Sequence, residues 1–188
     1  MRSMPPEKKN SDGPDHTDST EILISVPEMA DGASMWRIAR DSGSLDLNSS
    51  YAYLLFCRDF SRTCRLATVD GEPAGFVLGY RRPDRPDCLF VWQVAVDANH
   101  RGAGISSRLL DDLVTSELEP PVRTVETTIT DDNAASQALF AAFARRWGAE
   151  LSTSTFITAE HFPDGHDGEP LYEIGPLDLG APRAATAR

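Results

Sequence analysis

The first third of the chain alternates short apolar runs with polar breaks, and the spacing predicts one strand followed by two helices. Residues 22–26 form an extended apolar run. Apolar positions then recur every three or four residues from Met29 to Ala39, as on the buried face of a helix that Gly43 ends. Residues 45–50 are turn-like, and residues 51–60 predict a second helix, which Ser49 or Ser50 would cap.

The middle of the chain predicts strands that follow one another closely. Residues 65–69 and 73–80 are extended runs joined by an Asp-Gly dipeptide, which favours a tight hairpin turn. Residues 81–87 contain three Arg, two Pro and two Asp, so we expect a polar loop there. Residues 89–96 are apolar nearly throughout and rich in valine, which indicates a central strand buried on both faces.

The last third begins with a glycine-rich loop at residues 97–104. A helix, a strand, a helix and two strands are expected after it, at residues 105–118, 122–129, 133–147, 150–158 and 171–174. The resulting order, β-α-α-β-β-β-α-β-α-β-β, predicts a mixed sheet with helices packed on it, of the α/β or α+β class.

Length and composition favour one folded domain. The chain has 188 residues, of which 40% are hydrophobic and 25% charged, as in ordinary globular proteins. The domain is expected at residues 21–177. Residues 1–20 and 178–188 have the polar or low-complexity composition of disordered tails.

Charge and cysteine content restrict the partners and the compartment. The net charge of −11 disfavours nucleic acid and anionic membranes as partners. The only lysines are Lys8 and Lys9, so a catalytic lysine within the domain is excluded. Three cysteines without a C-x-x-C pair indicate buried thiols in a reducing compartment. With no apolar run long enough to span a bilayer, we expect a cytoplasmic protein.

The loop at residues 97–104 carries candidate chemistry. Between a buried strand and a helix, a glycine-rich turn presents backbone N–H groups at the positive end of the helix dipole, which suits an anion. Gly102 and Gly104 would allow close approach of a pyrophosphate, and Arg101 adds a permanent positive charge. The loop lacks the full spacing of a Walker or dinucleotide-binding motif. On its own it fits a phosphorylated cofactor and a purely structural turn equally well.

Two segments resemble the signatures of the GNAT acetyltransferases. Val94-Ala95-Val96 followed by Arg101-Gly102-Ala103-Gly104-Ile105-Ser106 resembles the V-x-V strand and the R-x-x-G-x-G/A loop, with serine in the last position. Residues 133–140 resemble the N-x-x-A-x-x-L-Y element, with Ser136 and Phe140 as departures. Many members have a tyrosine where Phe140 stands, and it is proposed to protonate the leaving thiolate. Because Phe140 has no proton to give, that acid is unassigned here.

Two longer strings resemble the diaminobutyrate acetyltransferases of ectoine biosynthesis within this class. They are residues 42–51 (SGSLDLNSSY) and 90–96 (FVWQVAV), and the resemblance spans about residues 21–176. It implies a mostly antiparallel sheet flanked by helices, acetyl-CoA as cosubstrate, no metal, and transfer of acetyl to the 4-amino group of L-2,4-diaminobutyrate. It also implies a homodimer that acts under osmotic stress.

The resemblance assigns residues to acetyl-CoA. They lie on the strand, on the glycine-rich loop and on the following helices: Val94, Ala95, Val96, Arg101, Gly102, Ala103, Gly104, Ile105, Ser106, Asn133 and Phe140. A backbone N–H near Val94 would hold the oxyanion, and such a donor typically contributes about a hundredfold in rate.

Four residues are expected in the substrate site: Asp46, Tyr51, Trp92 and Glu169. Asp46 would bind a substrate ammonium, although it could equally be an ordinary turn residue. Tyr51 and Trp92 would form pocket walls, although aromatic residues are more often plain core. Glu169 would bind the second ammonium or accept a proton, with Glu126 as the alternative.

The remaining candidates favour simpler interpretations. The stretch that contains His161, Asp164, His166, Asp167 and Glu169 is interrupted by proline and glycine, so a solvated loop is expected rather than a metal site. Cys57 and Cys88 lack a histidine partner, so direct acetyl transfer is expected. Two alternatives stay open: acetylation of another amine, such as a polyamine, an aminoglycoside or a protein N-terminus, and a non-catalytic acyl-CoA sensor.

Overall fold

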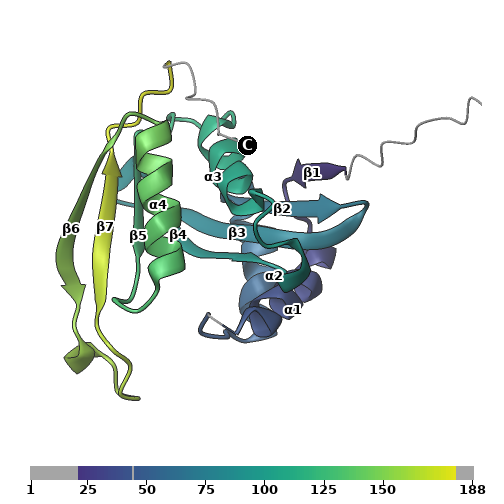
Figure 1. The fold of residues 1–188 in the computed structure, drawn as a ribbon, viewed down its shortest axis with the longest axis horizontal. Helices are drawn as coiled ribbons and strands as arrows, with labels where there is room; N and C mark the ends of the chain where they lie inside the picture. The colour runs from purple at the N-terminus through teal and green to yellow at the C-terminus, as the bar shows by residue number, and fades with distance from the viewer. Residues whose placement is uncertain (1–20, 44, 181–188) are drawn as a thin grey trace, which may run out of the picture.

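The strands form a seven-stranded sheet in the order β1-β2-β3-β4-β5-β7-β6 (Figure 1). The computed structural model describes residues 21–43 and 45–180. Every neighbouring pair is antiparallel except β4 and β5, which are parallel. The strands are β1 (Ile22–Ser25), β2 (Cys64–Val69), β3 (Glu72–Arg82), β4 (Arg85–Val96), β5 (Thr124–Thr128), β6 (Glu150–Ile157) and β7 (Glu169–Gly175). The predicted mixed, mostly antiparallel sheet and the predicted order of elements are confirmed.

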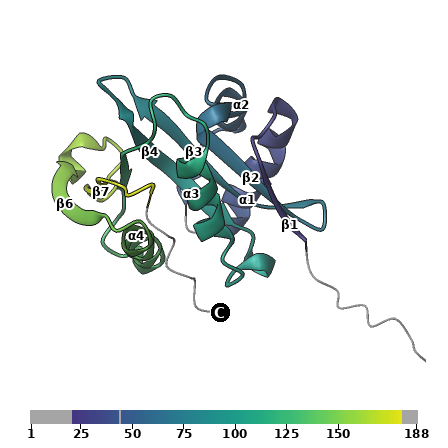
Figure 2. The ribbon, with the colours of Figure 1, turned by 90° about the horizontal axis from the view of Figure 1, so that it is seen from above.

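Two helices cover each face of the sheet (Figure 2). They are α1 (Gly32–Ser42), α2 (Ser50–Asp59), α3 (Ile105–Thr115) and α4 (Ala134–Arg146). Buried side chains of α3 and α4 form one core with the sheet, and those of α1 and α2 form a second core on the opposite face. Leu109, Leu113 and Phe143 are fully buried in the first core, and Met35 and Ile38 in the second.

The predicted hairpin between β2 and β3 is present. Asp70 (φ 51°) and Gly71 (φ 86°) both have positive φ, which matches the twist of the flanking strands. The Asp70 carboxylate also accepts a hydrogen bond from the Glu21 backbone N–H at 3.0 Å, so the turn holds the strand β1 beside it.

The prediction of a polar loop at residues 81–87 is wrong, because β3 continues to Arg82 and β4 begins at Arg85. Only Pro83 and Asp84 remain as a turn. The charged side chains are accommodated in strands because they pair across the sheet. The Glu126 carboxylate on β5, 2% exposed, lies 3.0 Å from Arg82 and 2.8 Å from Arg85.

An extra residue in β4 changes the direction of its side chains. Leu78 pairs with Gln93 and Gly79 pairs with Val91, so Trp92 has no partner on β3 and forms a β-bulge. Val91 therefore belongs to the core under α3 and α4, whereas Gln93, two residues later, faces α2 on the opposite side. The prediction of a strand buried on both faces is wrong for Phe90, Trp92 and Val94, which are only half-buried.

Backbone hydrogen bonds hold the C-terminal part of the described chain, and the predicted limits of the domain stay a prediction. Leu177 donates a backbone hydrogen bond to Arg123 at 2.8 Å, and Asp178 donates one to Trp147 at 3.1 Å. Residues 1–20 and 181–188, for which disorder was predicted, lie outside the described residues. Among the described residues, no helix is long and apolar enough to cross a membrane.

Gly79 tests how tightly the bulge is packed. A Cβ atom at this position would lie 2.8 Å from the carbonyl oxygen of Phe90 and 3.2 Å from that of Thr63. We expect Gly79→Ala to lower the free energy of unfolding by about 1–3 kcal/mol, measured by urea denaturation. Gly180→Ala is the control, because the nearest atom to its Cβ would be 3.6 Å away. Equal stability of the two variants would contradict this packing.

Candidate functional site

The parallel strands β4 and β5 separate part of the way along β4. Their pairing ends at Phe90 and Glu126. On the other edge of β4, the Asp97 N–H donates to the Ala74 carbonyl at 2.8 Å. Because hydrogen-bonded pairs alternate along antiparallel strands, Ala95 and Gln93 direct their N–H groups toward β3, and Val94 and Val96 direct theirs toward the opening. The sheet thus offers free donors at the place where an acyl group would lie.

A cavity of about 280 Å³ occupies this opening. Its walls come from the end of α1, from β4, from the loop before α3 and from α4: Ser42, Leu45, Val94, Ala95, Val96, Arg101, Ser106, Asn133, Ala135, Ser136 and Leu139. Six of these residues are among those that the resemblance assigns to acetyl-CoA. The structure therefore brings most of the predicted cofactor residues to one cavity.

The glycine-rich loop has the geometry of an anion cradle. Gly102 (φ 81°) and Gly104 (φ 73°) adopt left-handed conformations, and a Cβ atom at either would meet nothing within 4 Å. The first helical hydrogen bond of α3 runs from the Arg108 N–H to the Gly104 carbonyl. The preceding N–H groups at the start of α3 consequently have no acceptor within the helix. The Arg101 guanidinium donates to the Ser42 carbonyl at 2.9 Å, which fixes its position beside the loop.

Three predicted cofactor residues have other surroundings. Asn133 lines the cavity but also caps α4, because its side-chain oxygen accepts a hydrogen bond from the Ser136 N–H at 3.0 Å. Phe140 and Ile105 are each 1% exposed and belong to the core under α3 and α4. Their side chains support the cavity from behind and do not line it.

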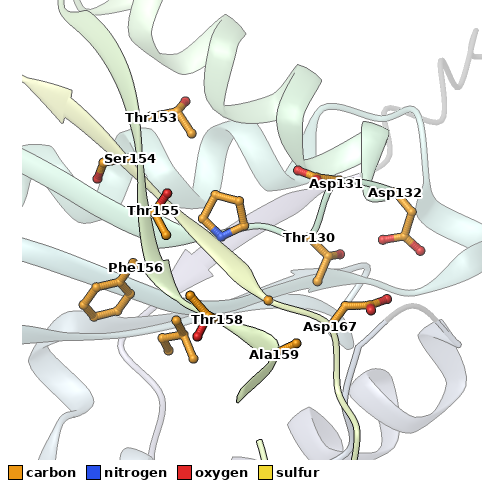
Figure 3. A pocket seen from close by; sticks show the side chains of 13 residues that line it. Thr130, Asp131, Asp132, Thr153, Ser154, Thr155, Phe156, Thr158, Ala159 and Asp167 are labelled. Carbon is orange, nitrogen blue, oxygen red and sulfur yellow. The ribbon is translucent and has the colours of Figure 1, made fainter. Parts of the chain in front are cut away.

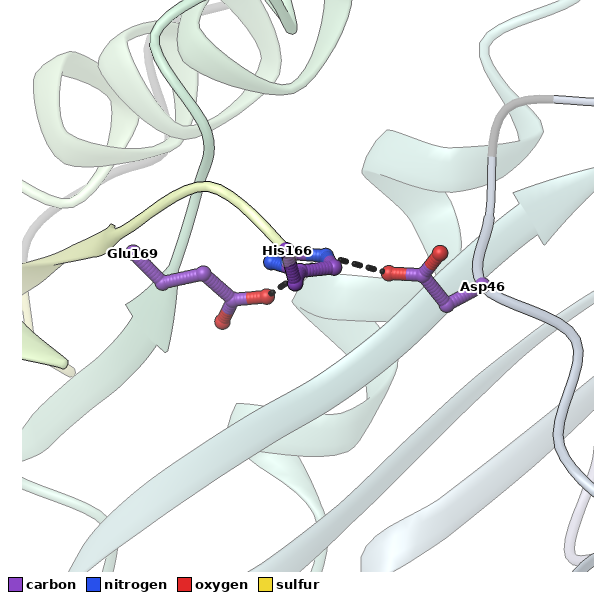
Figure 4. Close-up of side chains that lie close together, drawn as sticks. All are labelled: Asp46, His166 and Glu169. Atoms are coloured by element: carbon purple, nitrogen blue, oxygen red, sulfur yellow. Dashed lines mark hydrogen bonds and ion pairs between the residues drawn. The ribbon is translucent and has the colours of Figure 1, made fainter. Parts of the chain in front are cut away.

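Asp46, His166 and Glu169 meet although they are far apart in the sequence (Figure 4). His166 lies between the two carboxylates, with Nε2 at 2.9 Å from Asp46 Oδ2 and at 3.9 Å from Glu169 Oε1. The His166 ring packs against the ring of Phe162 at a tilt of 36°, with ring centroids 4.4 Å apart. The Glu169 carboxylate accepts a short hydrogen bond from the Thr128 hydroxyl. The loop before β7 is thus largely exposed, but His166 within it and Glu169 at the start of β7 make specific contacts.

The hydrogen-bond partners of the two ring nitrogens of His166 favour its protonated form. Nδ1 lies 2.6 Å from the Asp167 carbonyl oxygen, which can only accept, so Nδ1 carries a proton. Nε2 faces the Asp46 carboxylate, which also accepts, and this favours a second proton. The bond to the Asp167 carbonyl and the contact with Asp46 raise the pKa of His166 above its usual value. These contacts therefore favour the protonated form of His166, which lies between two carboxylates.

The same three side chains could hold a metal ion. Their ligand atoms lie within 4.8 Å of one another. A hydrogen bond from Nδ1 to a backbone carbonyl is also the arrangement that metal-bound histidines adopt. The absence of a metal from the reaction stays a prediction.

A buried network supports the segment that carries Asp46. The Gln93 side-chain amide donates to the Asp46 carbonyl at 3.0 Å and accepts from the Tyr53 hydroxyl at 2.9 Å. Burial raises the pKa of Tyr53, and hydrogen bonds with Gln93 and the Asn48 backbone oppose that rise. Sequence analysis missed this network. The available signal was a glutamine in the middle of an apolar strand.

The other candidates lie outside the cavity walls. Tyr51 is 64% exposed. Trp92 stacks on Phe56 with centroids 4.8 Å apart, which places it against α2. Glu126 is held by Arg82 and Arg85, as described above. The buried thiols of Cys57 and Cys88 have pKa values raised to about 11 and about 12, mainly by burial, so neither is an effective nucleophile at neutral pH.

Two further cavities adjoin this region. One of about 770 Å³ is lined by Asp46 and His166 and shares Leu45, Asn133 and Ala135 with the cavity at Val94. The two cavities thus adjoin, and the second has Asp46 and His166, but not Glu169, in its wall. Another, of about 780 Å³, lies between β6 and the start of α4 (Figure 3). Its walls are mainly hydroxyl and carboxylate side chains, and it includes neither Val94 nor Asp46.

The titration of His166 tests the cluster. We expect Asp46→Asn to lower the pKa of His166, measured by NMR, because one of the two carboxylates that favour the imidazolium is removed. Since the folded pKa is raised, His166 stabilises the fold fully below about pH 6.5, and this contribution is lost as pH rises through the folded value. Asp164→Asn removes another carboxylate of the same loop and serves as control. A pKa that is unchanged in Asp46→Asn would disprove the contact.

Known proteins share this sequence and fold. The sequence model of the Acetyltransferase (GNAT) family matches residues 33–144. The L-2,4-diaminobutyric acid acetyltransferase of Streptomyces coelicolor is 52% identical over 163 residues, covering 85% of this chain and 96% of that protein. Its counterpart from Streptomyces avermitilis is 53% identical over 161 residues, covering 83% and 89%.

A solved structure extends the likeness to three dimensions. The diaminobutyrate acetyltransferase of Paenibacillus lautus, in complex with its substrate L-2,4-diaminobutyric acid and coenzyme A, is 42% identical. It superposes with a TM-score of 0.80 and covers 84% of this chain and 96% of that one. The chain therefore belongs to the GNAT acetyltransferases, and within them to the family of L-2,4-diaminobutyric acid acetyltransferases.

Proposed function

We propose that the protein transfers the acetyl group of acetyl-CoA to the 4-amino group of L-2,4-diaminobutyrate, as a step of ectoine biosynthesis. The observation that carries this proposal is that the cavity beside Val94 adjoins the cavity lined by Asp46 and His166, with Glu169 next to His166. A thioester beside β4 and a cationic amine beside the carboxylates would meet there. The relatives named above act on, and in one case bind, this diamine.

The chain's own residues fit acetyl-CoA. Arg101 and the N–H groups at the start of α3 would hold its phosphates, and the open space beside Gly102 and Gly104 admits them. Acetyl-CoA supplies the activated carbonyl carbon. The Val94 N–H would stabilise the negative charge that develops on the carbonyl oxygen when the amine attacks.

The attacking amine has to lose a proton. An aliphatic amine with a pKa near 10 is neutral in only about one molecule in a thousand at pH 7. Glu169 is our candidate for accepting that proton, because its carboxylate lies in the cluster and is oriented by the Thr128 hydroxyl. Asp46 would hold the other ammonium group.

Positioning has to decide which nitrogen reacts. The 2-amino group is the less basic of the two, so more of it is neutral and it would be acetylated first in solution. If Asp46 binds the 2-ammonium, the 4-amine is directed toward Val94, and the enzyme overrides the intrinsic preference.

The setting of the reaction also belongs to the proposal. The three cysteines are buried and unpaired, which suits a reducing cytoplasm. The homodimer and the role in osmotic stress stay predictions that rest on the resemblance.

The first experiment is a substrate panel. We would measure CoA release with acetyl-CoA and L-2,4-diaminobutyrate, ornithine, spermidine or an aminoglycoside, and locate the acetyl group by NMR. Selective 4-N-acetylation of diaminobutyrate is the expected result. Preference for another amine would overturn the substrate, and binding of acetyl-CoA without turnover of any amine would overturn the enzymatic function.

Asp46→Asn tests the ammonium site. We expect the KM for diaminobutyrate to rise about 10- to 100-fold, the effect of losing a charged hydrogen bond, while the KM for acetyl-CoA stays unchanged. Asp164→Asn should leave both constants unchanged. Equal effects of Asp46→Asn on the two substrates would count against the assignment.

Arg101→Ala tests the proposed site for the phosphates of acetyl-CoA. The KM for acetyl-CoA should rise about tenfold because a charged donor is lost, and the KM for the amine should not change. Arg108→Ala is the matched control, since its guanidinium reaches the Ile22 carbonyl on β1 at 3.1 Å, away from the cavity. A similar loss in both variants would mean that Arg101 acts through stability alone.

A further inference from the structure

Gln93 joins the two parts of the proposed active site. It directly precedes Val94 on β4, and its side chain is 6% exposed between the sheet and α2. Its amide N–H donates to the Asp46 carbonyl at 3.0 Å. A single side chain therefore connects the strand that carries the carbonyl-binding N–H to the segment that carries the ammonium-binding carboxylate.

The segment around Asp46 depends on this connection. Residues 46–49 have no regular secondary structure. The Asp46 carbonyl accepts hydrogen bonds from the Gln93 side chain at 3.0 Å and from the Asn48 side chain at 3.4 Å, and the Tyr53 hydroxyl donates to Gln93 at 2.9 Å. Tyr53 is fully buried, so water does not replace its bond to Gln93. The network holds this irregular segment at a defined distance from β4.

Only an amide satisfies both neighbours of Gln93. The Asp46 carbonyl requires a donor, and the Tyr53 hydroxyl, which donates to Gln93, requires an acceptor. An ionised glutamate would place an acceptor against the Asp46 carbonyl. An aliphatic side chain would leave the buried Tyr53 hydroxyl without its acceptor and the Asp46 carbonyl with only the longer bond from the Asn48 side chain.

The bulge makes this arrangement possible. Because Trp92 is the extra residue, Gln93 faces α2 and the Asp46 segment while the N–H of Val94 remains directed toward the cavity. The separation between the Val94 N–H and the backbone of Asp46 is thus restrained by the hydrogen bond from Gln93. A diamine that spans both points has to match that separation.

We propose that Gln93 is a positioning residue that sets the chain-length selectivity of the enzyme, so that a diamine of diaminobutyrate length is acetylated in preference to shorter or longer homologues. This inference rests on the proposed function, in particular on ammonium binding by Asp46. It assigns to Gln93 a role in selectivity without contact between its side chain and the reacting atoms.

Gln93→Met, which keeps the length of the side chain and removes both hydrogen bonds, tests the proposal. We would measure kcat and KM for L-2,4-diaminobutyrate, L-2,3-diaminopropionate and L-ornithine. The preference for diaminobutyrate, taken as the ratio of kcat/KM values, should fall about tenfold through the KM of the amine. The KM for acetyl-CoA should remain within about twofold of its wild-type value.

A matched control separates selectivity from stability. Thr63→Val removes another buried side-chain donor, which bonds the Gly79 carbonyl at 2.7 Å and the Phe60 carbonyl at 2.9 Å. It should lower the melting temperature without changing the selectivity ratios. If Gln93→Met is too unstable to assay, Tyr53→Phe keeps the Gln93–Asp46 bond and removes only its support, and a smaller loss of selectivity is expected.

The outcomes distinguish the inference from the proposed function. A wild-type protein that does not acetylate diaminobutyrate would overturn both the function and the inference built on it. An active wild type with an unchanged selectivity ratio in Gln93→Met, or in Tyr53→Phe where that variant replaces it, would overturn the inference alone. Faster hydrogen exchange at residues 45–49 in Gln93→Met, together with lost selectivity, would support it.

Discussion

The extra residue in β4 is the constraint on which the proposed site depends. With Trp92 unpaired, Val91 packs under α3 and α4 while Gln93 faces α2, so one strand serves both cores. The pairing of β4 with β5 ends at Phe90, just before the bulge. The free N–H groups of the following residues then face a cavity and not another strand. Without the bulge, Val91 and Gln93 would face the same side of the sheet. The strand would then lose either the packing of Val91 under α3 and α4 or the hydrogen bond from Gln93 to Asp46.

Around this opening, the sheet and helices bring opposite charges to two neighbouring places. Arg101 and the start of α3 provide positive charge and N–H groups near the glycine-rich loop. Asp46 and Glu169 provide negative charge on either side of His166. This separation of charge suits a reaction between an anionic acyl carrier and a cationic amine. The positive charge beside the glycine-rich loop comes from an arginine, because the chain has no lysine after Lys9.

The acidic cluster is assembled from three segments, each held by its own contacts. Gln93 and Tyr53 hold the segment of Asp46, Phe162 and the Asp167 carbonyl hold the ring of His166, and the Thr128 hydroxyl orients Glu169. The contacts of Asp46 and Glu169 join residues far apart in the sequence, whereas those that hold the His166 ring are local. The precision of the site therefore depends on the packing of β4, β5 and β7 as a unit.

The sequence by itself determined the order of the elements, the Asp70–Gly71 hairpin and the glycine-rich loop. Each depends on local periodicity or on the backbone preference of one or two residues. It also pointed to Asp46 and Glu169, but through resemblance to a family and not through their spacing.

Only the tertiary structure decided that residues 81–87 lie mostly in paired strands and that Trp92 forms a bulge. It also decided that Phe140 is buried and that His166 lies beside the carboxylates of Asp46 and Glu169. Arg82 and Arg85, which suggested a loop, are strand residues whose guanidinium groups pair with the carboxylate of Glu126 on β5. A bulge depends on the register of a partner strand, and the contact between His166 and Asp46 joins residues 120 positions apart. Such pairings follow from the packing of the whole sheet, which no short stretch of sequence encodes.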